Sequence, residues 1–197
     1  MHYLAGDADG QTPLDPEEAA QILRSAITTH GELDTVEQEN IARAVQWAFN
    51  RKRPFDAVLD EPFLRRLHQR MFGDVWRWAG TYRQTPRNIG VDAWLIPQEV
   101  AGLIGNARYS VERNTYDPTE VSVRFHHRLV AIHPFANGNG RHSRLAADLL
   151  IASLDGEPLS WGSRLELDAA AIRARYIAAL RSADANDLAD LIAFARS

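Results

Sequence analysis

The stretch HPFANGNGRHSR, residues 133–144, combines residue types that suit phosphate chemistry. His133 precedes a proline, which disfavours the right-handed helical conformation, so a helix that leads to it should end there. The Gly-Asn-Gly turn at 138–140 then enters a new helix near Arg141, where consecutive N–H groups and the helix dipole favour an anion. Arg141 and Arg144 are three residues apart, so their side chains can reach the same anion.

The histidine at the rim of this turn could act as a general base. Nearby positive charge lowers the pKa of an imidazole, which keeps His133 neutral and able to accept a proton near pH 7. Together these parts indicate phosphoryl or nucleotidyl transfer. Simpler alternatives are an ordinary turn, a structural histidine and an Arg144–Asp148 pair at i,i+4. A P-loop is excluded because no Lys-Ser/Thr follows the glycines, and a dinucleotide fingerprint because no third glycine and no preceding strand appear.

The composition limits the class of protein that could carry this motif. The chain has 197 residues, a formal net charge of −4 and no cysteine. That length fits one domain, the charge argues against a nucleic-acid coat protein, and disulfides and thiolate metal sites are impossible. The first residues lack a signal-peptide pattern, and no apolar run approaches the ~20 residues that cross a bilayer. We therefore expect a soluble, cytoplasmic protein with no nucleic-acid or membrane partner.

Helical periodicity dominates the chain, so the predicted fold class is mainly α. Residues 14–27 and 34–52 are expected to form N-terminal helices, the second with Asp34 as N-cap and Glu37 completing a capping box. Further helices are predicted over 60–73, 97–113, 117–132, 140–154, 167–183 and 186–197. Residues 76–97 mix aromatic and β-branched residues with glycine and proline, which favours a short hairpin or an irregular loop.

The motif at 133–144 closely resembles the signature of the Fic family, His-Pro-Phe-x-(Asp/Glu)-Gly-Asn-Gly-Arg-x-x-Arg. The segments WRWAGTYR, NIGVDAWLIP and VRFHHRLVAIHPF are similar to the Fic branch known as mobile mystery protein B. The resemblance implies a helical bundle with a short β-hairpin flap, and transfer of AMP from ATP to a Ser, Thr or Tyr hydroxyl of a protein. Its domains would be an N-terminal extension at 1–55, with an inhibitory helix at about 34–53, and a core at 56–197.

The family's site residues carry over to matching positions. His133 would deprotonate the target hydroxyl, and Phe135 would anchor the loop in the core. Residues of the flap at Asn88, Ile89, Gly90 and Val91 would dock the target backbone. The nucleotide phosphates would be held by Gly138, Asn139, Gly140, Arg141 and Arg144.

Asn137 departs from the family pattern, which has Asp or Glu at this position to hold Mg²⁺. An asparagine offers a carbonyl oxygen to a hard cation but no negative charge, so Mg²⁺ binding should be weaker. Three outcomes stay open: slower AMP transfer, a different nucleotide or phospho-substrate, and lost chemistry.

A second resemblance concerns Thr35, Glu39 and Asn40, which match the Ser/Thr-x-x-x-Glu-Gly/Asn pattern of the family's inhibitory helix. The glutamate would pair with Arg144 and occupy the phosphate site. On its helix Glu39 falls away from the apolar stripe, so a solvated surface glutamate is the alternative.

Two functions follow from this reading. The first is an auto-inhibited AMP transferase that modifies a target protein or itself; the second is a non-catalytic relative that binds a nucleotide or a partner, as in a toxin–antitoxin pair. A homodimer is consistent with the family. The target, the nucleotide preference and the oligomeric state do not follow from the sequence.

Overall fold

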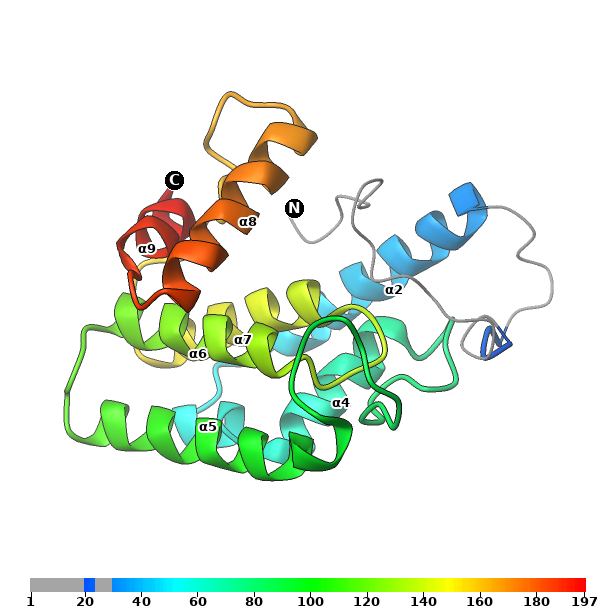
Figure 1. Ribbon diagram of the computed structural model, residues 1–197, viewed down its shortest axis with the longest axis horizontal. Helices are drawn as coiled ribbons and strands as arrows, with labels where there is room; N and C mark the ends of the chain where they lie inside the picture. Colours follow the sequence, from blue (N-terminus) through cyan, green and yellow to red (C-terminus); the bar gives the residue numbers. More distant parts are fainter. Residues whose placement is uncertain (1–19, 24–29) are drawn as a thin grey trace.

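The computed structural model describes residues 20–23 and 30–197, and this part of the chain is helical, as predicted (Figure 1). Its elements are α2 (His30–Phe49), α3 (Phe55–Val58), α4 (Glu61–Phe72), the 3-10 helix η1 (Ala93–Leu95), α5 (Ile96–Glu112), α6 (Pro118–Ile132), α7 (Asn139–Ser153), α8 (Ala169–Asp184) and α9 (Ala189–Arg196).

Aspartate side chains mark the beginnings of three helices. Asp60 accepts a hydrogen bond from the Phe63 backbone at 3.0 Å, and Asp117 accepts one from Thr119 at 2.8 Å. The Asp168 side chain does the same for the Ala171 backbone at 2.8 Å. These caps satisfy backbone donors that have no partner inside the helix, which explains why the predicted helices begin within a residue or two of the observed ones.

Helices α6 and α7 form the centre of the bundle, with α5 packed along one side of α6 (Figure 1). Helices α8 and α9 pack on each other, and α9 contacts α6. Helix α2 packs against α4 and reaches α7, which places it beside the loop that joins α6 to α7. The N-terminal helix therefore belongs to the same packed unit as residues 56–197.

The core divides into two clusters of buried apolar side chains. The larger one joins α2, α4, α5, α6 and α7 around Phe72 and Trp76, and the smaller one surrounds Trp161 and Phe194 near α8 and α9. On α2, Ile41, Ala44 and Ala48 are buried as their spacing predicts, whereas Phe49 at the end of the helix is exposed.

The β-hairpin flap expected within residues 76–97 is wrong. The described residues contain no strand, and the β-type contacts there are isolated bridges between Ile22 and Trp76 and between Tyr82 and Phe135. The Arg83 side chain donates to the backbone oxygens of Thr85 and Val91, so these carbonyls are not available for cross-strand pairing. The flap is an irregular loop held by an arginine.

Two expectations for the N-terminal region also change. The helix predicted over 14–27 falls largely outside the described residues, and residues 20–23 within it form a turn and a bridge. The capping box of Asp34 and Glu37 is wrong because α2 already begins at His30, so both residues lie inside the helix. Among the described residues, no helix is both long and apolar enough to cross a membrane.

Candidate functional site

The loop between α6 and α7 carries the motif, and two residues in it have left-handed backbone conformations. His133 ends α6 with φ 53°, and Gly138 precedes α7 with φ 74°. His133 therefore avoids the right-handed helical region, as Pro134 predicts, but it is left-handed rather than extended. A Cβ at position 138 would lie 2.4 Å from the Phe72 ring, so only glycine fits there. Helix α7 begins at Asn139, one residue before the range of 140–154 that was expected.

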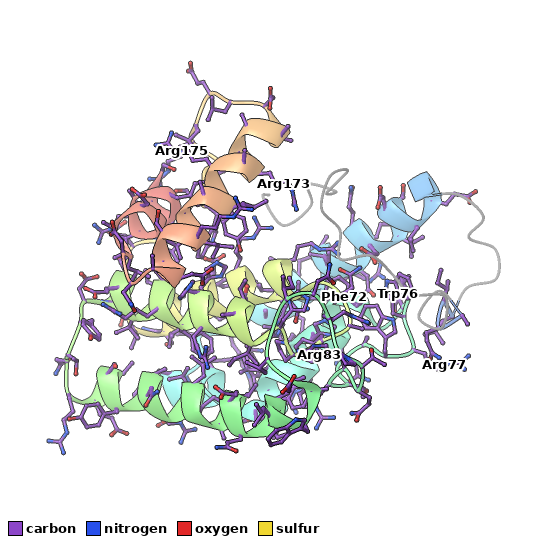
Figure 2. All side chains as sticks on the ribbon, viewed as in Figure 1. Phe72, Trp76, Arg77, Arg83, Arg173 and Arg175 are labelled. Atoms are coloured by element: carbon purple, nitrogen blue, oxygen red, sulfur yellow. The ribbon has the colours of Figure 1, made fainter. Side chains whose placement is uncertain are left out.

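Arg83 holds the conformation of His133 from outside the motif. Its side chain is 3% exposed, and its Nε donates to the His133 carbonyl at 2.7 Å. The Arg83 backbone N–H donates to the Pro134 carbonyl at 3.0 Å, and the Val91 N–H to the Ile132 carbonyl at 3.3 Å. Hydrogen bonds of the backbone and of the Arg83 guanidinium thus join the flap loop to the end of α6. Figure 2 labels Arg83 at this place in the fold.

The imidazole of His133 is buried and has no hydrogen-bond partner for either ring nitrogen among the described residues. Burial, together with the positive charges of Arg83 and Arg87, lowers its pKa to about 4. The ring is therefore neutral at pH 7. Buried polar nitrogens without partners are rare, and at a concave site they indicate a group that bonds to a ligand.

Two other side chains stabilise the loop. Asn139 is buried; its Oδ1 accepts from the Phe135 N–H and its Nδ2 donates to the Phe135 carbonyl, both at 2.9 Å. His68 accepts from the Gly80 N–H through Nδ1 at 3.0 Å, so its Nε2 carries the proton donated to the Asn137 carbonyl at 3.1 Å. The Asn139 side chain therefore shapes the loop, and only its backbone N–H is placed to serve a phosphate.

Asn137 turns its amide toward its own backbone. The Gly138 N–H donates to Asn137 Oδ1 at 2.6 Å, and no group of three or more His, Cys, Asp or Glu residues able to hold a metal occurs in the described residues. The residues present do not fit a dedicated Mg²⁺ site, because the one motif oxygen that could ligate the ion is already an acceptor and carries no charge.

Arg141 is held by an ion pair that the sequence did not predict. Its Nη1 lies 2.8 Å from Oε2 of Glu37 on α2, and its guanidinium lies 4.9 Å from the centre of the Phe72 ring. The other Glu37 oxygen accepts from Trp76 Nε1 at 2.5 Å, and the glutamate is 7% exposed. A buried carboxylate is therefore in place beside the first arginine of the motif.

Arg144, the second arginine, lies against α8. Its guanidinium is 5.4 Å from the centre of the Tyr176 ring, and the Tyr176 hydroxyl is 3.2 Å from His126 Nε2. A Cβ on Gly140 would lie 3.8 Å from the same hydroxyl, so α8 borders the beginning of α7. The two arginines consequently contact different elements, although they are only three residues apart at the beginning of α7.

The three residues predicted to be inhibitory occupy different environments on α2. Thr35 and Glu39 are exposed, whereas Asn40 is buried and joins α2 to the end of α4 through the Arg70 carbonyl and the Asp74 N–H, both at 2.9 Å. Within the part of the chain that the structure describes, Glu37 of α2 forms an ion pair with Arg141 of the motif, and the inhibitory role of Glu39 stays a prediction.

The predicted docking residues lie beside the histidine. Asn88, Ile89 and Gly90 are exposed, and Val91 is half-buried. Gly90 has φ 98°, and a Cβ on it would lie 2.6 Å from the His133 Cβ, so the loop passes directly over the histidine. The site thus has an exposed backbone segment in contact with a candidate base.

Sequence reasoning missed Glu37, Arg83 and His68. The signal for Glu37 was present, because it is one helical turn before Ile41 and so shares the buried face of α2. Arg83 and His68 carried no comparable signal, since their roles depend on loop conformations without a period.

Residues 58–151 match the model of the Fic/DOC family. Protein adenylyltransferase Fic from Drosophila grimshawi is 34% identical over 89 residues, which are 43% of this chain and 18% of that protein. Protein adenylyltransferase fic-1 from Caenorhabditis briggsae is 25% identical over 189 residues, 94% of this chain and 35% of that protein. This chain therefore spans about a third or less of the length of these relatives.

The fold agrees with this match. The ADP-bound N-terminal Fic domain of a cell filamentation protein from Bartonella quintana superposes with a TM-score of 0.68 at 17% identity, covering 87% of this chain and 86% of that one. Residues 58–151 therefore match the Fic/DOC family model, and the chain shares the helical fold of a Fic domain.

Proposed function

We propose that this chain transfers AMP from ATP to a hydroxyl group of a protein and that α2 holds the site in an inhibited state. The observation that carries the proposal is the buried, neutral His133, whose ring nitrogens have no partner in the described residues and which begins the loop that leads to α7. The names of the adenylyltransferase relatives support the same reaction.

In the proposed reaction, a ring nitrogen of His133 accepts the proton of the target hydroxyl. The hydroxyl oxygen then forms a bond to the α-phosphorus of ATP, the bond from that phosphorus to the bridging β-oxygen breaks, and pyrophosphate leaves. The N–H groups at the beginning of α7, with Arg141 and Arg144, bind the phosphates.

The low pKa of His133 suits the free protein and changes when the nucleotide binds. Arg83 and Arg87 disfavour the imidazolium, so the ring is ready to accept a proton at pH 7. Phosphate charges beside the ring favour the imidazolium and raise its pKa. A general base is most effective when its pKa lies near the working pH, so bound ATP makes His133 a more effective base.

The inhibitory contact in this proposal is Glu37–Arg141. With Arg141 paired to a buried carboxylate at 2.8 Å, its guanidinium is not available to a phosphate, and the negative charge of Glu37 repels the nucleotide. Thr35, Glu39 and Asn40, which match the family's inhibitory pattern, are proposed to support α2 rather than to block the site directly.

The target segment is proposed to lie along the flap loop at residues 88–91. Ile89 in this loop is 56% exposed and Trp94 shortly after it is 76% exposed, so both offer apolar side chains to a target. The mobile mystery protein B branch, self-modification and a homodimer remain proposals supported by the sequence resemblance. A soluble cytoplasmic location is a proposal supported by the sequence composition.

A second function, nucleotide or partner binding without transfer, is favoured by Asn137. Its amide oxygen accepts from the Gly138 N–H at 2.6 Å, so the position lacks both a charge and a free ligand oxygen for Mg²⁺. No step of the proposed reaction is assigned to a metal ion for that reason.

Labelled ATP separates these functions. The protein, and separately its His133→Ala variant, is incubated with cell-lysate proteins and ATP labelled at the α-phosphate or at the γ-phosphate. AMP transfer attaches the α-label but not the γ-label, and His133→Ala loses it. Attachment of the γ-label would indicate phosphoryl transfer, and ATP binding without either label would indicate the non-catalytic function.

A further inference from the structure

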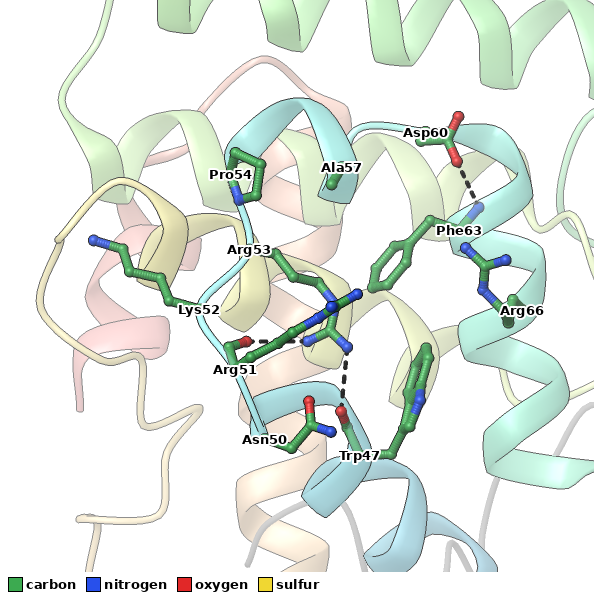
Figure 3. Close-up of a pocket in the computed structure, with 10 residues that line it drawn as sticks. All are labelled: Trp47, Asn50, Arg51, Lys52, Arg53, Pro54, Ala57, Asp60, Phe63 and Arg66. Carbon is green, nitrogen blue, oxygen red and sulfur yellow. Dashed lines mark hydrogen bonds between the residues drawn. The ribbon is translucent and has the colours of Figure 1, made fainter.

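A cavity of about 700 Å³ lies where α2 ends and α4 begins, away from the motif loop (Figure 3). Its wall includes four cationic side chains and one acidic side chain, in a chain whose net charge is −4. The cationic side chains are Arg51, Lys52, Arg53 and Arg66, and the acidic one is Asp60. The local excess of positive charge is therefore a property of this cavity.

Arg53 forms a fixed part of the wall. It is buried, and its guanidinium donates to the carbonyls of Trp47 and Ala48 at the end of α2 and to the Arg51 carbonyl (Figure 3). The same group lies 5.0 Å from the centre of the Trp47 ring and 5.4 Å from that of Phe63. This arginine caps the helix, so its charge stays at the cavity whether or not a ligand binds.

Arg51 and Arg66 are exposed side chains of the same cavity, and no ion pair involves either within residues 20–23 and 30–197. Neighbouring cations do have carboxylate partners: Lys52 pairs with Asp155 at 2.5 Å, and Arg43 with Asp74 at 2.5 Å. The wall's own acid, Asp60, is engaged as the N-cap of α4.

The guanidinium groups of Arg51, Arg53 and Arg66 repel one another. Burial is the main cause of the lowered pKa of Arg53, and the charges of Arg51 and Arg66 lower it further. A bound anion would offset this repulsion. Guanidinium groups match phosphate oxygens in shape and charge better than any other side chain does.

We propose that this cavity binds an oligophosphate anion, with Arg51 and Arg66 as its mobile ligands and Arg53 as a fixed charge at the wall. The Trp47 ring already contacts Phe63, Arg53 and Arg70, so it does not offer a free face to a nucleotide base. The cavity is therefore proposed to recognise the phosphate groups of its ligand and not a base. The site is separate from the motif, since Trp47 is ten residues beyond Glu37, or ~15 Å along the helix.

Calorimetric titration with pyrophosphate tests the site in the full chain, on a background of Arg141→Gln with Arg144→Gln that removes the motif's own cations. This background is expected to bind one pyrophosphate. Adding Arg51→Gln and Arg66→Gln should weaken binding on the order of tenfold or more, because two charge-assisted contacts are lost. Adding Arg113→Gln and Arg175→Gln, which make the same change in net charge outside the cavity, should leave it unchanged.

Equal affinity in the cavity variant and its background would overturn the proposal, as would an equal loss in the charge-matched control. Nuclear magnetic resonance of the arginine Nε–Hε groups provides a second measurement in the otherwise unsubstituted protein. Pyrophosphate should shift the resonances of Arg51 and Arg66, and unshifted signals would contradict the site.

The same titration distinguishes two sources of the phosphates. If ATP binds the Arg141→Gln, Arg144→Gln protein with the same affinity as pyrophosphate, and adenosine does not bind, the phosphate tail of a nucleotide is an equivalent ligand. Pyrophosphate binding without ATP binding would support the free anion. Binding of adenosine alone, or of an oligoglutamate peptide in preference to both phosphates, would overturn the proposed ligand class.

Discussion

The carboxylate of Glu37 lies 2.8 Å from the guanidinium of Arg141, which joins α2 to the first turn of α7. Its second oxygen accepts from Trp76 Nε1, so both oxygens have partners in a buried setting. A carboxylate held in this way keeps an arginine of the phosphate loop occupied until a stronger anion replaces it.

Glu37→Gln should tighten ATP binding by about tenfold, because the amide keeps an acceptor for Trp76 but no longer pairs with Arg141. Titration calorimetry with ATP measures the change. Glu39→Gln, an exposed change of the same kind on the same helix, is the matched control and should leave the affinity unaltered. Equal effects of both variants would mean that the charge of α2, and not its contact with Arg141, controls binding.

Arg83→Lys should lower kcat on the order of 100-fold, because a lysine cannot bridge the carbonyls of His133, Thr85 and Val91 that fix the histidine. Arg83→Gln should in addition raise the pKa of His133, since it removes a charge that lowers this pKa. Imidazole resonances followed against pH report the pKa directly. An unchanged pKa in Arg83→Gln, or an unchanged kcat in both variants, would contradict the positioning role.

The folded protein should lose stability between pH 6.5 and pH 4. Burial lowers the pKa of His142 to about 4 and that of His126 to about 3, and it also lowers the pKa of His68. As the pH falls below 6.5, the unfolded chain takes up protons that the folded chain does not, so the free energy of unfolding decreases. Urea unfolding at pH 7 and pH 4.5 measures the difference, and His142→Gln should reduce it. A free energy of unfolding that does not change over this range would mean that these histidines are accessible to protons.

Asn137→Asp should raise both the rate of AMP transfer and its dependence on Mg²⁺, since a carboxylate at this position adds the charge that the amide lacks. Transfer rates at several Mg²⁺ concentrations test this, with Asn137→Ala as the control that removes the oxygen. A rate and a metal dependence that are the same in Asn137→Asp and the native protein would show that position 137 does not limit the reaction.

The helices were the predictable part of the structure. Periodic apolar residues defined α4, α5, α6 and α7 almost to the residue, with aspartate caps at α4 and α6, because local hydrogen bonds and burial act within one element. The motif loop was also predictable from the sequence, because the backbone conformation decides where the loop needs a glycine and where its arginines emerge. The left-handed conformation of Gly138 against Phe72 is one such case.

Contacts between elements were not predictable. The flap was expected to pair its own strands, but the Arg83 side chain bonds to its carbonyls instead, and nothing in the order of residues indicates this. The family pattern singles out Glu39 as the inhibitory residue, which stays a prediction, and it gives no indication that Glu37 pairs with Arg141. Two residues turn a helix by ~200°, so Glu37 and Glu39 lie on opposite faces of α2.

The most direct test of auto-inhibited AMP transfer is intact-mass spectrometry of four proteins after incubation with ATP and lysate proteins. They are the native chain, Glu37→Gln, Glu39→Gln and the double variant Glu37→Gln with His133→Ala. AMP adducts on the chain or on lysate proteins should increase at least about tenfold in Glu37→Gln, stay at the native level in Glu39→Gln and disappear in the double variant. Adducts that persist in the double variant, or that do not increase in Glu37→Gln, would contradict the account.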